Sequence, residues 1–201
     1  MKLLIIIIIV IVLAIATYYK FFKNDYTTLF DDRIVLNNKF TKEISNLYIP
    51  ESETGIEFTY TFWINIKNIP ENAGNLLSSY KKSKFIFGIN DSPGFYYNIH
   101  KNQIQIKIKY NTDHHIITIN QLKLQKWIHI AVVLENRALT IYIDGELYKS
   151  TLIPSVPFIY NKQLSIGQKN NNFNGSLADG RYYNRALSHD TIISVYSNNK
   201  L

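Results

Sequence analysis

The chain has 201 residues, of which 46% are hydrophobic and 14% aromatic, a composition that supports one sizeable core and argues against intrinsic disorder. It has no cysteine, which excludes disulfide frameworks, thiol nucleophiles and thiolate metal sites. The net charge of +7 comes from lysines scattered along the chain without a nucleic-acid-binding motif, so we expect no nucleic-acid partner. The 15 tyrosines and 11 phenylalanines favour β-strands.

The first part of the chain is an apolar segment. Residues 3–19 carry no charge, and as a helix they would span roughly 25 Å, close to the thickness of a bilayer core. The small residues of Ala14-Ile15-Ala16 resemble a signal-peptidase site. Aromatic residues interleaved with Lys20 and Lys23 instead resemble the interfacial belt of a spanning helix. We therefore predict a transmembrane anchor or signal peptide with its flank over residues 1–24, and we favour the uncleaved anchor.

The next part of the chain mixes turn residues with short apolar runs. In residues 24–53 the turn-forming Asn37-Asn38 and Pro50 indicate a short stalk followed by an entering strand. Residues 56–67 alternate apolar and polar side chains, which predicts a strand with one strongly apolar side. Turn signals then separate further strand candidates at the spacing typical of sandwiches. These candidates are residues 84–89, 95–100, 103–110, 115–119 and 164–167.

Residues 127–150 predict three consecutive antiparallel strands. Residues 127–134 are apolar on both faces, and residues 139–143 alternate up to Asp144-Gly145, a pair suited to a two-residue type I′ turn. Apolar faces of this kind require a second layer, and a second antiparallel sheet supplies it. The sequence thus predicts an all-β sandwich of two antiparallel sheets. The exception is a helix over residues 188–197 with Ser188 as its N-cap.

The strand candidate at residues 103–110 separates apolar from polar residues. Ile104, Ile106, Ile108 and Tyr110 would face the core, because side chains alternate along a strand. The other face would carry a polar, basic stripe, which is either a surface for an anionic ligand or an ordinary solvated face. The stripe consists of Gln103, Gln105, Lys107 and Lys109.

Three blocks of the sequence carry a family resemblance: FTYTFWINIK (58–67), WIHIAVVLENRALTIYIDGELYKS (127–150) and LSIGQKNNNFNGSLADGRYYNRALSHDTI (164–192). In this order and spacing they resemble the laminin-G-like, concanavalin A-like lectin/glucanase domains. The resemblance covers most of the chain after the apolar segment and implies a jelly-roll sandwich, which we assign to residues 25–201. The departure is at Ala178-Asp179-Gly180, where Gly180 indicates a bulge or loosened strand pairing.

Enzymatic activity is not expected. Glycoside hydrolases need two carboxylates across the scissile bond, about 5 Å apart for a retaining mechanism. The sequence offers Glu51 and Glu53 in a loop, and Asp144 and Glu146 around a hairpin turn, and turn chemistry and solvation explain both pairs. A glycoside hydrolase is therefore the least favoured function.

Metal binding is not expected either. His114 and His115 are adjacent, so they would point to opposite faces of a strand and would not share one ion. His129 stands where similar domains carry a packing histidine. Some laminin-G-like domains place a calcium-ligating aspartate on the loop that holds Asp91 here, but calcium takes six to eight oxygens and a turn-forming role is favoured. We predict no metal and no cofactor, with calcium as the alternative.

The favoured function is a non-catalytic, membrane-anchored binding module that recognises carbohydrate or a protein partner through the rim loops 90–94 and 111–115 or through the basic stripe. A literal positive-inside count would place the domain in the cytoplasm, but the basic residues are few, and we expect a single-pass protein with its domain outside the cytoplasm, on a cell or virion surface. The alternative is a structural or membrane protein of a large DNA virus particle. Candidate ligand-binding residues are Asn90, Asp91, Asp113, His114, Gln105, Lys107 and Lys109.

Overall fold

The computed structural model describes residue 11 and residues 25–37, 41–44, 56–67, 83–89, 92–110, 112–157, 163–168 and 173–201. Within these residues no helix has the length and the apolarity that crossing a bilayer requires. The predicted anchor over residues 1–24 lies outside the described residues, apart from residue 11, and stays a prediction.

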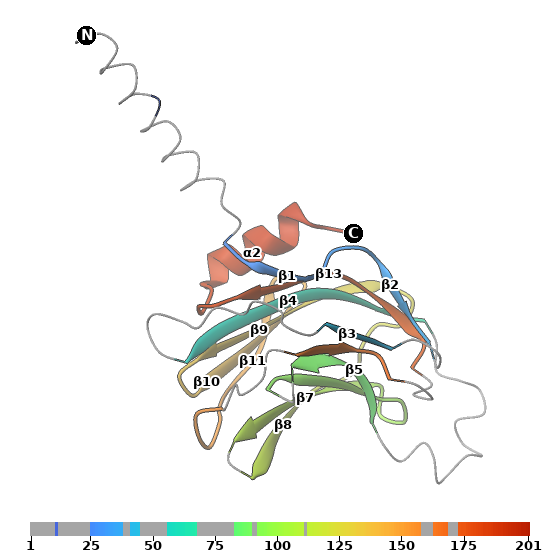
Figure 1. Cartoon of the computed structure of the whole chain (residues 1–201), viewed down its shortest axis with the longest axis horizontal. Helices are drawn as coiled ribbons and strands as arrows, with labels where there is room; N and C mark the ends of the chain where they lie inside the picture. Colours follow the sequence, from blue (N-terminus) through green and yellow to red (C-terminus); the bar gives the residue numbers. More distant parts are fainter. Residues whose placement is uncertain are drawn as a thin grey trace.

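The fold is a sandwich of two antiparallel sheets, as predicted (Figure 1). The seven-stranded sheet has the order β1 (Thr27–Phe30), β13 (Gly175–Tyr183), β4 (Glu57–Ile66), β9 (Trp127–Glu135), β10 (Ala138–Ile143) and β11 (Glu146–Leu152), and β2 (Ile34–Leu36) also pairs with β13. The six-stranded sheet has the order β3 (Lys42–Ile44), β12 (Leu164–Ile166), β5 (Lys84–Ile89), β6 (Gly94–Asn98), β7 (Gln103–Tyr110) and β8 (Asp113–Ile119).

The core lies between the two sheets and is built from alternate residues of each strand. On β4, for example, Phe58 and Phe62 are fully buried. The ring of Phe62 meets that of Phe87 edge to face at 4.8 Å, and Phe87 stacks on Phe95 at 4.5 Å. These aromatic contacts join strands of both sheets, so the apolar alternation seen in the sequence produces the sandwich.

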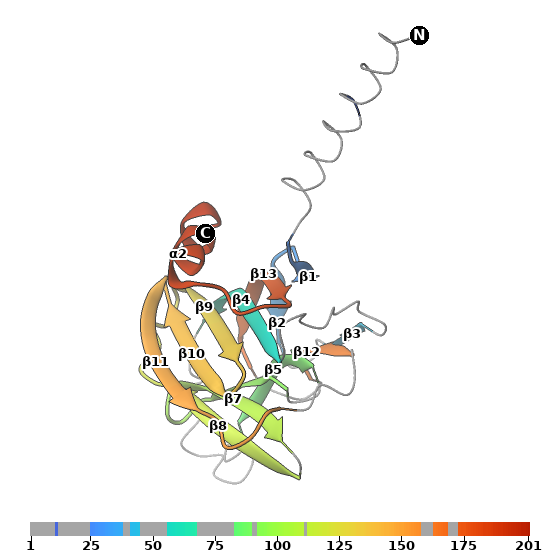
Figure 2. The same ribbon diagram turned by 90° about the vertical axis from the view of Figure 1, so that its left-hand side faces the viewer.

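The helix α2 (His189–Asn198) packs on the outer face of the seven-stranded sheet, on the side away from β7 and β8 (Figure 2). Its Ile192 is fully buried and packs against Ala131, Val133 and Tyr183 in a second, smaller apolar cluster. The Ser188 hydroxyl accepts a hydrogen bond from the Thr191 amide at 3.3 Å, which confirms the predicted N-cap.

The predicted hairpin turn is also confirmed. Asp144 and Gly145 have φ angles of 51° and 83°, which is the positive pair that a type I′ turn requires. The bulge expected at Gly180 appears as a break in the register between β13 and β4 from Ala178 to Arg181. A Cβ on Gly180 would collide with the ring of Phe30, so this close approach requires a glycine.

Residues 24–53 were predicted to form a short stalk followed by an entering strand, and for the part that the structure describes the stalk was wrong. This part of the chain forms three strands, β1, β2 and β3. β1 and β2 pair with β13 in the seven-stranded sheet, and β3 pairs with β12 in the six-stranded sheet. Their partners lie more than 100 residues further along the chain: Thr27 pairs with Tyr182 and Glu43 with Ser165. Short strands with such distant partners carry too little periodicity to be recognised locally.

Candidate functional site

The outer face of the six-stranded sheet carries the candidate site. One row of paired residues crosses all six strands on this face. The row faces outward, because the neighbouring residues Phe87 and Ile106 are fully buried in the core and side chains alternate. From β3 to β8 the row consists of Glu43, Ser165, Gly88, Gly94, Lys107 and Ile116.

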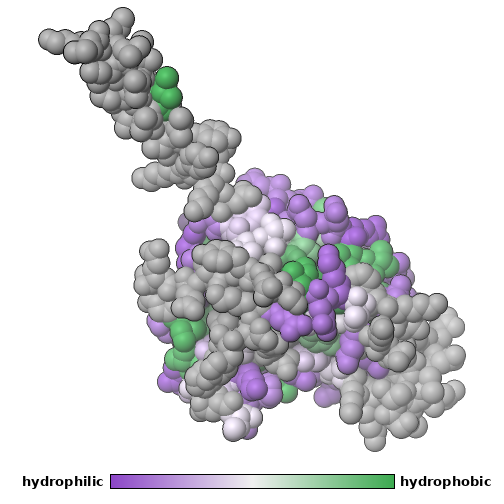
Figure 3. Space-filling model, viewed as in Figure 1, coloured by the Kyte–Doolittle hydropathy of each residue, from purple (hydrophilic) through white to green (hydrophobic). Residues whose placement is uncertain are grey.

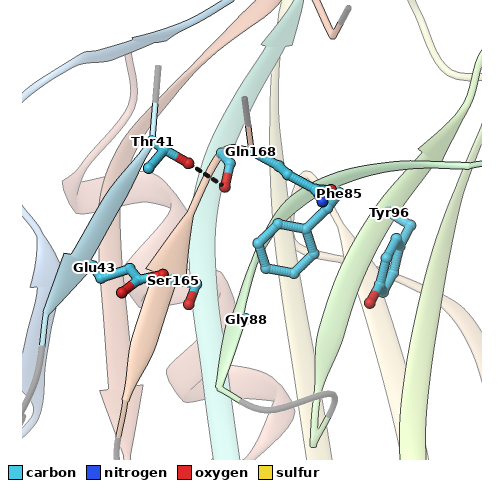
Figure 4. Close-up of a pocket in the computed structure, with 8 residues that line it drawn as sticks. Thr41, Glu43, Phe85, Gly88, Tyr96, Ser165 and Gln168 are labelled. Carbon is cyan, nitrogen blue, oxygen red and sulfur yellow. Dashed lines mark hydrogen bonds between the residues drawn. The ribbon is translucent and has the colours of Figure 1, made fainter. Parts of the chain in front are cut away.

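Two glycines make the middle of this row hollow. Gly88 and Gly94 are partners on β5 and β6, and a Cβ on Gly88 would lie 2.8 Å from both the Gly94 Cα and the Pro93 carbonyl oxygen. The backbones therefore approach where no side chain fits. The space above Gly88 is a pocket of about 340 Å³. It is lined by Thr41, Glu43, Phe85, Gly88, Tyr96, Ser165, Gly167 and Gln168 (Figure 4).

One wall of the pocket is aromatic. The register between β5 and β6 shifts between Phe85 and Phe87, so that Ile86 and Phe87 both turn into the core. Phe85 is left on the outer face opposite Tyr96, and the two rings meet edge to face at 5.3 Å. Both side chains are half-buried and border the pocket (Figure 4).

The opposite wall is polar. Glu43 and Ser165 are partners on β3 and β12, across Gly88 from the aromatic wall (Figure 4). The Glu43 carboxylate accepts a hydrogen bond from the Gln163 side-chain amide at 3.1 Å. The Thr41 hydroxyl donates to the Gly167 carbonyl at 3.3 Å, which ties the start of β3 to the end of β12. Hydrogen-bonding groups thus face an aromatic surface across a glycine floor.

The basic stripe predicted on β7 continues the aromatic wall. The Lys107 ammonium lies 3.9 Å from the centre of the Tyr96 ring, a cation–π contact. Gln105 is the partner of Tyr96 on β6 and accepts a hydrogen bond from the Ser83 hydroxyl at 2.5 Å. Lys109 is exposed, and its partner on β8 is His114, which is exposed as well. The structure therefore brings Gln105, Lys107, Lys109 and His114 together on one face.

The other predicted site residues have different positions. Asp113 pairs with Tyr110 at the turn between β7 and β8, next to His114. Gln103 was predicted to be exposed with the rest of the stripe, and this was wrong: its side chain is buried and donates to the Asn120 side-chain oxygen at 3.4 Å. Asn90 and Asp91 lie outside the described residues.

The structure places no cluster suited to a metal ion in the described part of the chain: nowhere there do three His, Asp or Glu side chains gather. Asp91, the residue behind the calcium alternative, falls outside that part. Calcium binding therefore stays an untested alternative.

Four buried side-chain atoms in the described strands of the seven-stranded sheet have no hydrogen-bond partner: Thr61 Oγ1 and Trp63 Nε1 on β4, His129 Nδ1 on β9 and Ser176 Oγ on β13. Of these residues, Trp63 and His129 lie next to Tyr196 of α2. The His129 ring lies 5.2 Å from Trp63 and 5.7 Å from Tyr196 of α2. Burial, with a smaller effect of the Arg181 charge, lowers the pKa of His129 to about 4, so its imidazole is neutral at pH 7. His129 is thus a packing residue, as predicted.

Sequence reasoning missed the pocket itself. Phe85 and Tyr96 were placed within predicted strands, but nothing local shows that a register shift puts both on the outer face. Glu43 and Ser165 are 122 positions apart and meet only through the pairing of β3 with β12. The usable signal was a pair of glycines: Gly88 lies within the strand candidate 84–89, whereas Gly94 was assigned to the rim loop 90–94 and is the first residue of β6 in the structure.

Comparison with known proteins identifies the class to which this fold belongs. A laminin-G family model, described as the concanavalin A-like lectin/glucanases superfamily, matches residues 43–193. The chain therefore belongs to this superfamily. No curated protein matches the sequence.

Solved structures share the fold at low sequence identity. The binding domain of botulinum neurotoxin serotype G superposes with a TM-score of 0.64 at 20% identity, over 86% of this chain and 46% of that one. The receptor-binding domain of botulinum neurotoxin D gives a TM-score of 0.63 at 16% identity, over 86% of this chain and 52% of that one. This chain thus spans about half the length of the structures it matches.

Proposed function

We propose that this chain is a membrane-anchored, non-catalytic binding module that recognises carbohydrate through the pocket on the outer face of the six-stranded sheet. The observation that carries the proposal is the pairing of an aromatic wall, Phe85 and Tyr96, with a polar wall, Glu43 and Ser165, over a glycine floor. A sugar ring has an apolar face of C–H groups and a rim of hydroxyl groups. The first packs on an aromatic side chain, and the second hydrogen-bonds to carboxylate and hydroxyl oxygens.

The charge around the pocket favours an anionic sugar. Lys107 lies against Tyr96 at the edge of the aromatic wall, and Lys109 and His114 extend the same face. A carboxylate or sulfate on the ligand would meet the Lys107 ammonium while the ring stacks on Tyr96. The pocket and the stripe would then be two parts of one binding surface. The rim loop 111–115 would add Asp113 to the end of this surface, at the turn between β7 and β8.

The composition of the pocket supports a binding role over hydrolysis. Among the described residues that line it, Glu43 is the one carboxylate. Hydrolysis by either stereochemical course uses two carboxylates placed on both sides of the scissile bond. The superfamily includes both lectins and glucanases by its description, and the botulinum structures are described as binding domains, which is consistent with this choice.

A glycan array probed with the full chain in detergent tests the proposal. We expect binding to acidic glycans, lost in Tyr96→Ala and retained in Tyr148→Ala, a partly exposed tyrosine on β11 of the other sheet. An array without any glycan signal, or an unchanged signal for Tyr96→Ala, would contradict it. Sustained release of reducing ends from a bound polysaccharide would show that the non-catalytic part is wrong.

A further inference from the structure

The chain is fixed to the domain at Asp25 and Tyr26, just before β1. Asp25 forms an ion pair with Arg185. The guanidinium of Arg181 lies 4.5 Å from the centre of the Tyr26 ring, and Tyr26 meets Tyr183 at 5.5 Å. We call Asp25 and Tyr26, with these partners, the clamp. The hydrogen bond from Arg185 lowers the pKa of Asp25, so the pair is charged at neutral pH.

The clamp lies on the side of the molecule that carries α2. Tyr26 packs against the apolar cluster that holds Ile192 of α2, on the outer face of the seven-stranded sheet. Both views place β1 and α2 on one side and β7 and β8 on the other (Figures 1 and 2). The side that carries α2 and β1 shows mainly hydrophilic and neutral residues in the space-filling view (Figure 3). Such a surface suits lipid headgroups and not the hydrocarbon interior.

We propose that the α2 side of the domain faces the bilayer in which the chain is anchored, so that the carbohydrate-binding face points away from it and binds its ligand in trans, on an opposing surface or in solution. The inference rests on the proposed anchor and concerns the orientation that the clamp imposes. The aromatic belt predicted from the sequence ends at Phe22, and from Phe22 to Asp25 the chain has three residue steps, which reach at most about 11 Å. A clamp so close to the membrane limits rotation of the domain.

The thickness of the domain makes this orientation matter. Stacked sheets lie about 10 Å apart and a helix adds about 10 Å, so the binding face stands roughly 20 Å beyond the surface of α2. The Debye length is about 8 Å at physiological ionic strength. Lys107 and Lys109 would therefore be screened from the anionic lipids of their own membrane, and the stripe would stay free for an acidic ligand.

Single-cysteine labelling tests the orientation, because the chain has no cysteine of its own. Ser197→Cys places a fluorophore on the exposed side of α2, and Ile116→Cys places one on β8, where the side chain is 49% exposed. The full chain is reconstituted into liposomes whose headgroups carry a nitroxide quencher. We expect several-fold stronger quenching at residue 197 than at residue 116. Equal quenching in floated liposomes, or stronger quenching at residue 116, would overturn the orientation.

Two further measurements separate the possible failures. Flotation of the labelled chain on a density gradient reports the anchor alone: a chain that does not float overturns both the proposed anchorage and this inference. The double variant Tyr26→Ala with Arg185→Ala removes the contacts of the clamp, and we expect it to make the quenching at residues 197 and 116 similar. The control is Arg137→Ala, which changes an arginine in the turn between β9 and β10 and should keep the difference in quenching. A clamp variant that keeps the full difference, with unchanged circular dichroism, would show that the clamp does not set the orientation.

Discussion

The ammonium of Lys107 lies 3.9 Å above the ring of Tyr96, on the strand next to it in the six-stranded sheet. This contact joins the basic stripe to the aromatic wall of the pocket, and it explains why Lys107 is half-buried whereas Lys109 is exposed. A cation held on an aromatic ring is partly desolvated, which strengthens its interaction with an anion.

We expect Lys107→Ala with Lys109→Ala to weaken binding to an anionic glycan without unfolding the domain, because both side chains point outward. On a heparin column the double variant should elute at a lower salt concentration than the unchanged chain. The matched control is Lys123→Ala with Lys126→Ala, which removes the same charge from an exposed loop after β8. If both variants elute together, net charge and not the stripe determines retention.

Gly88→Ala should destabilise the domain. The added Cβ would meet two backbone atoms, the Gly94 Cα and the Pro93 oxygen, at 2.8 Å, and neither moves without shifting a strand. Overpacking of this kind costs about 1–3 kcal/mol, which denaturant titration measures. Ser165→Ala, in the same row of residues, is the control and should stay within about 0.5 kcal/mol of the parent. A Gly88→Ala variant of full stability would show that β5 and β6 are not so close.

The free energy of unfolding should depend on pH through His129. Its pKa is about 4 in the folded state, against about 6.5 for an unfolded histidine. Between these values the unfolded chain binds a proton that the folded chain does not, so stability is complete above pH 6.5 and falls as the pH drops toward 4, by about 3 kcal/mol.

Urea titrations at a series of pH values check this expectation. His129→Gln should lose most of the slope between pH 6.5 and 4, whereas the unchanged chain should show it in full. An identical slope in the His129→Gln variant would assign the acid sensitivity to other groups.

Residues 25–201 should fold without the apolar segment, as a soluble and mainly β domain. All strands that the structure describes begin at or after Thr27, so removing residues 1–24 leaves each of them in place. Far-ultraviolet circular dichroism and gel filtration of the truncated chain provide the measurement. A helical spectrum, or aggregation that the longer chain in detergent does not show, would contradict the expectation.

Local sequence signals predicted the parts of the fold whose partners are close in the chain. The hairpin at Asp144-Gly145 follows from turn chemistry, and the α2 start follows from Ser188 as a cap. β1 pairs Thr27 with Tyr182, and such distant pairing leaves no local trace. The residues of the candidate site also differ in how far apart they lie in the sequence. Lys109 and His114 belong to one hairpin and were found, whereas the pocket needs β3, β12, β5 and β6 side by side and was not.

The two tryptophans of the chain, Trp63 and Trp127, both lie on the outer face of the seven-stranded sheet. Trp63 is stacked under Tyr196 of α2, and Trp127 lies beneath Arg33. Tryptophan emission from this protein therefore monitors the docking of α2 and the clamp side of the molecule. It does not report on the outer face of the six-stranded sheet, where Tyr96 is the fluorescent residue that borders the pocket. In a sugar titration we expect the tryptophan emission to stay unchanged even when ligand occupies the pocket. Ligand binding therefore has to be followed through tyrosine emission or by a label-free method.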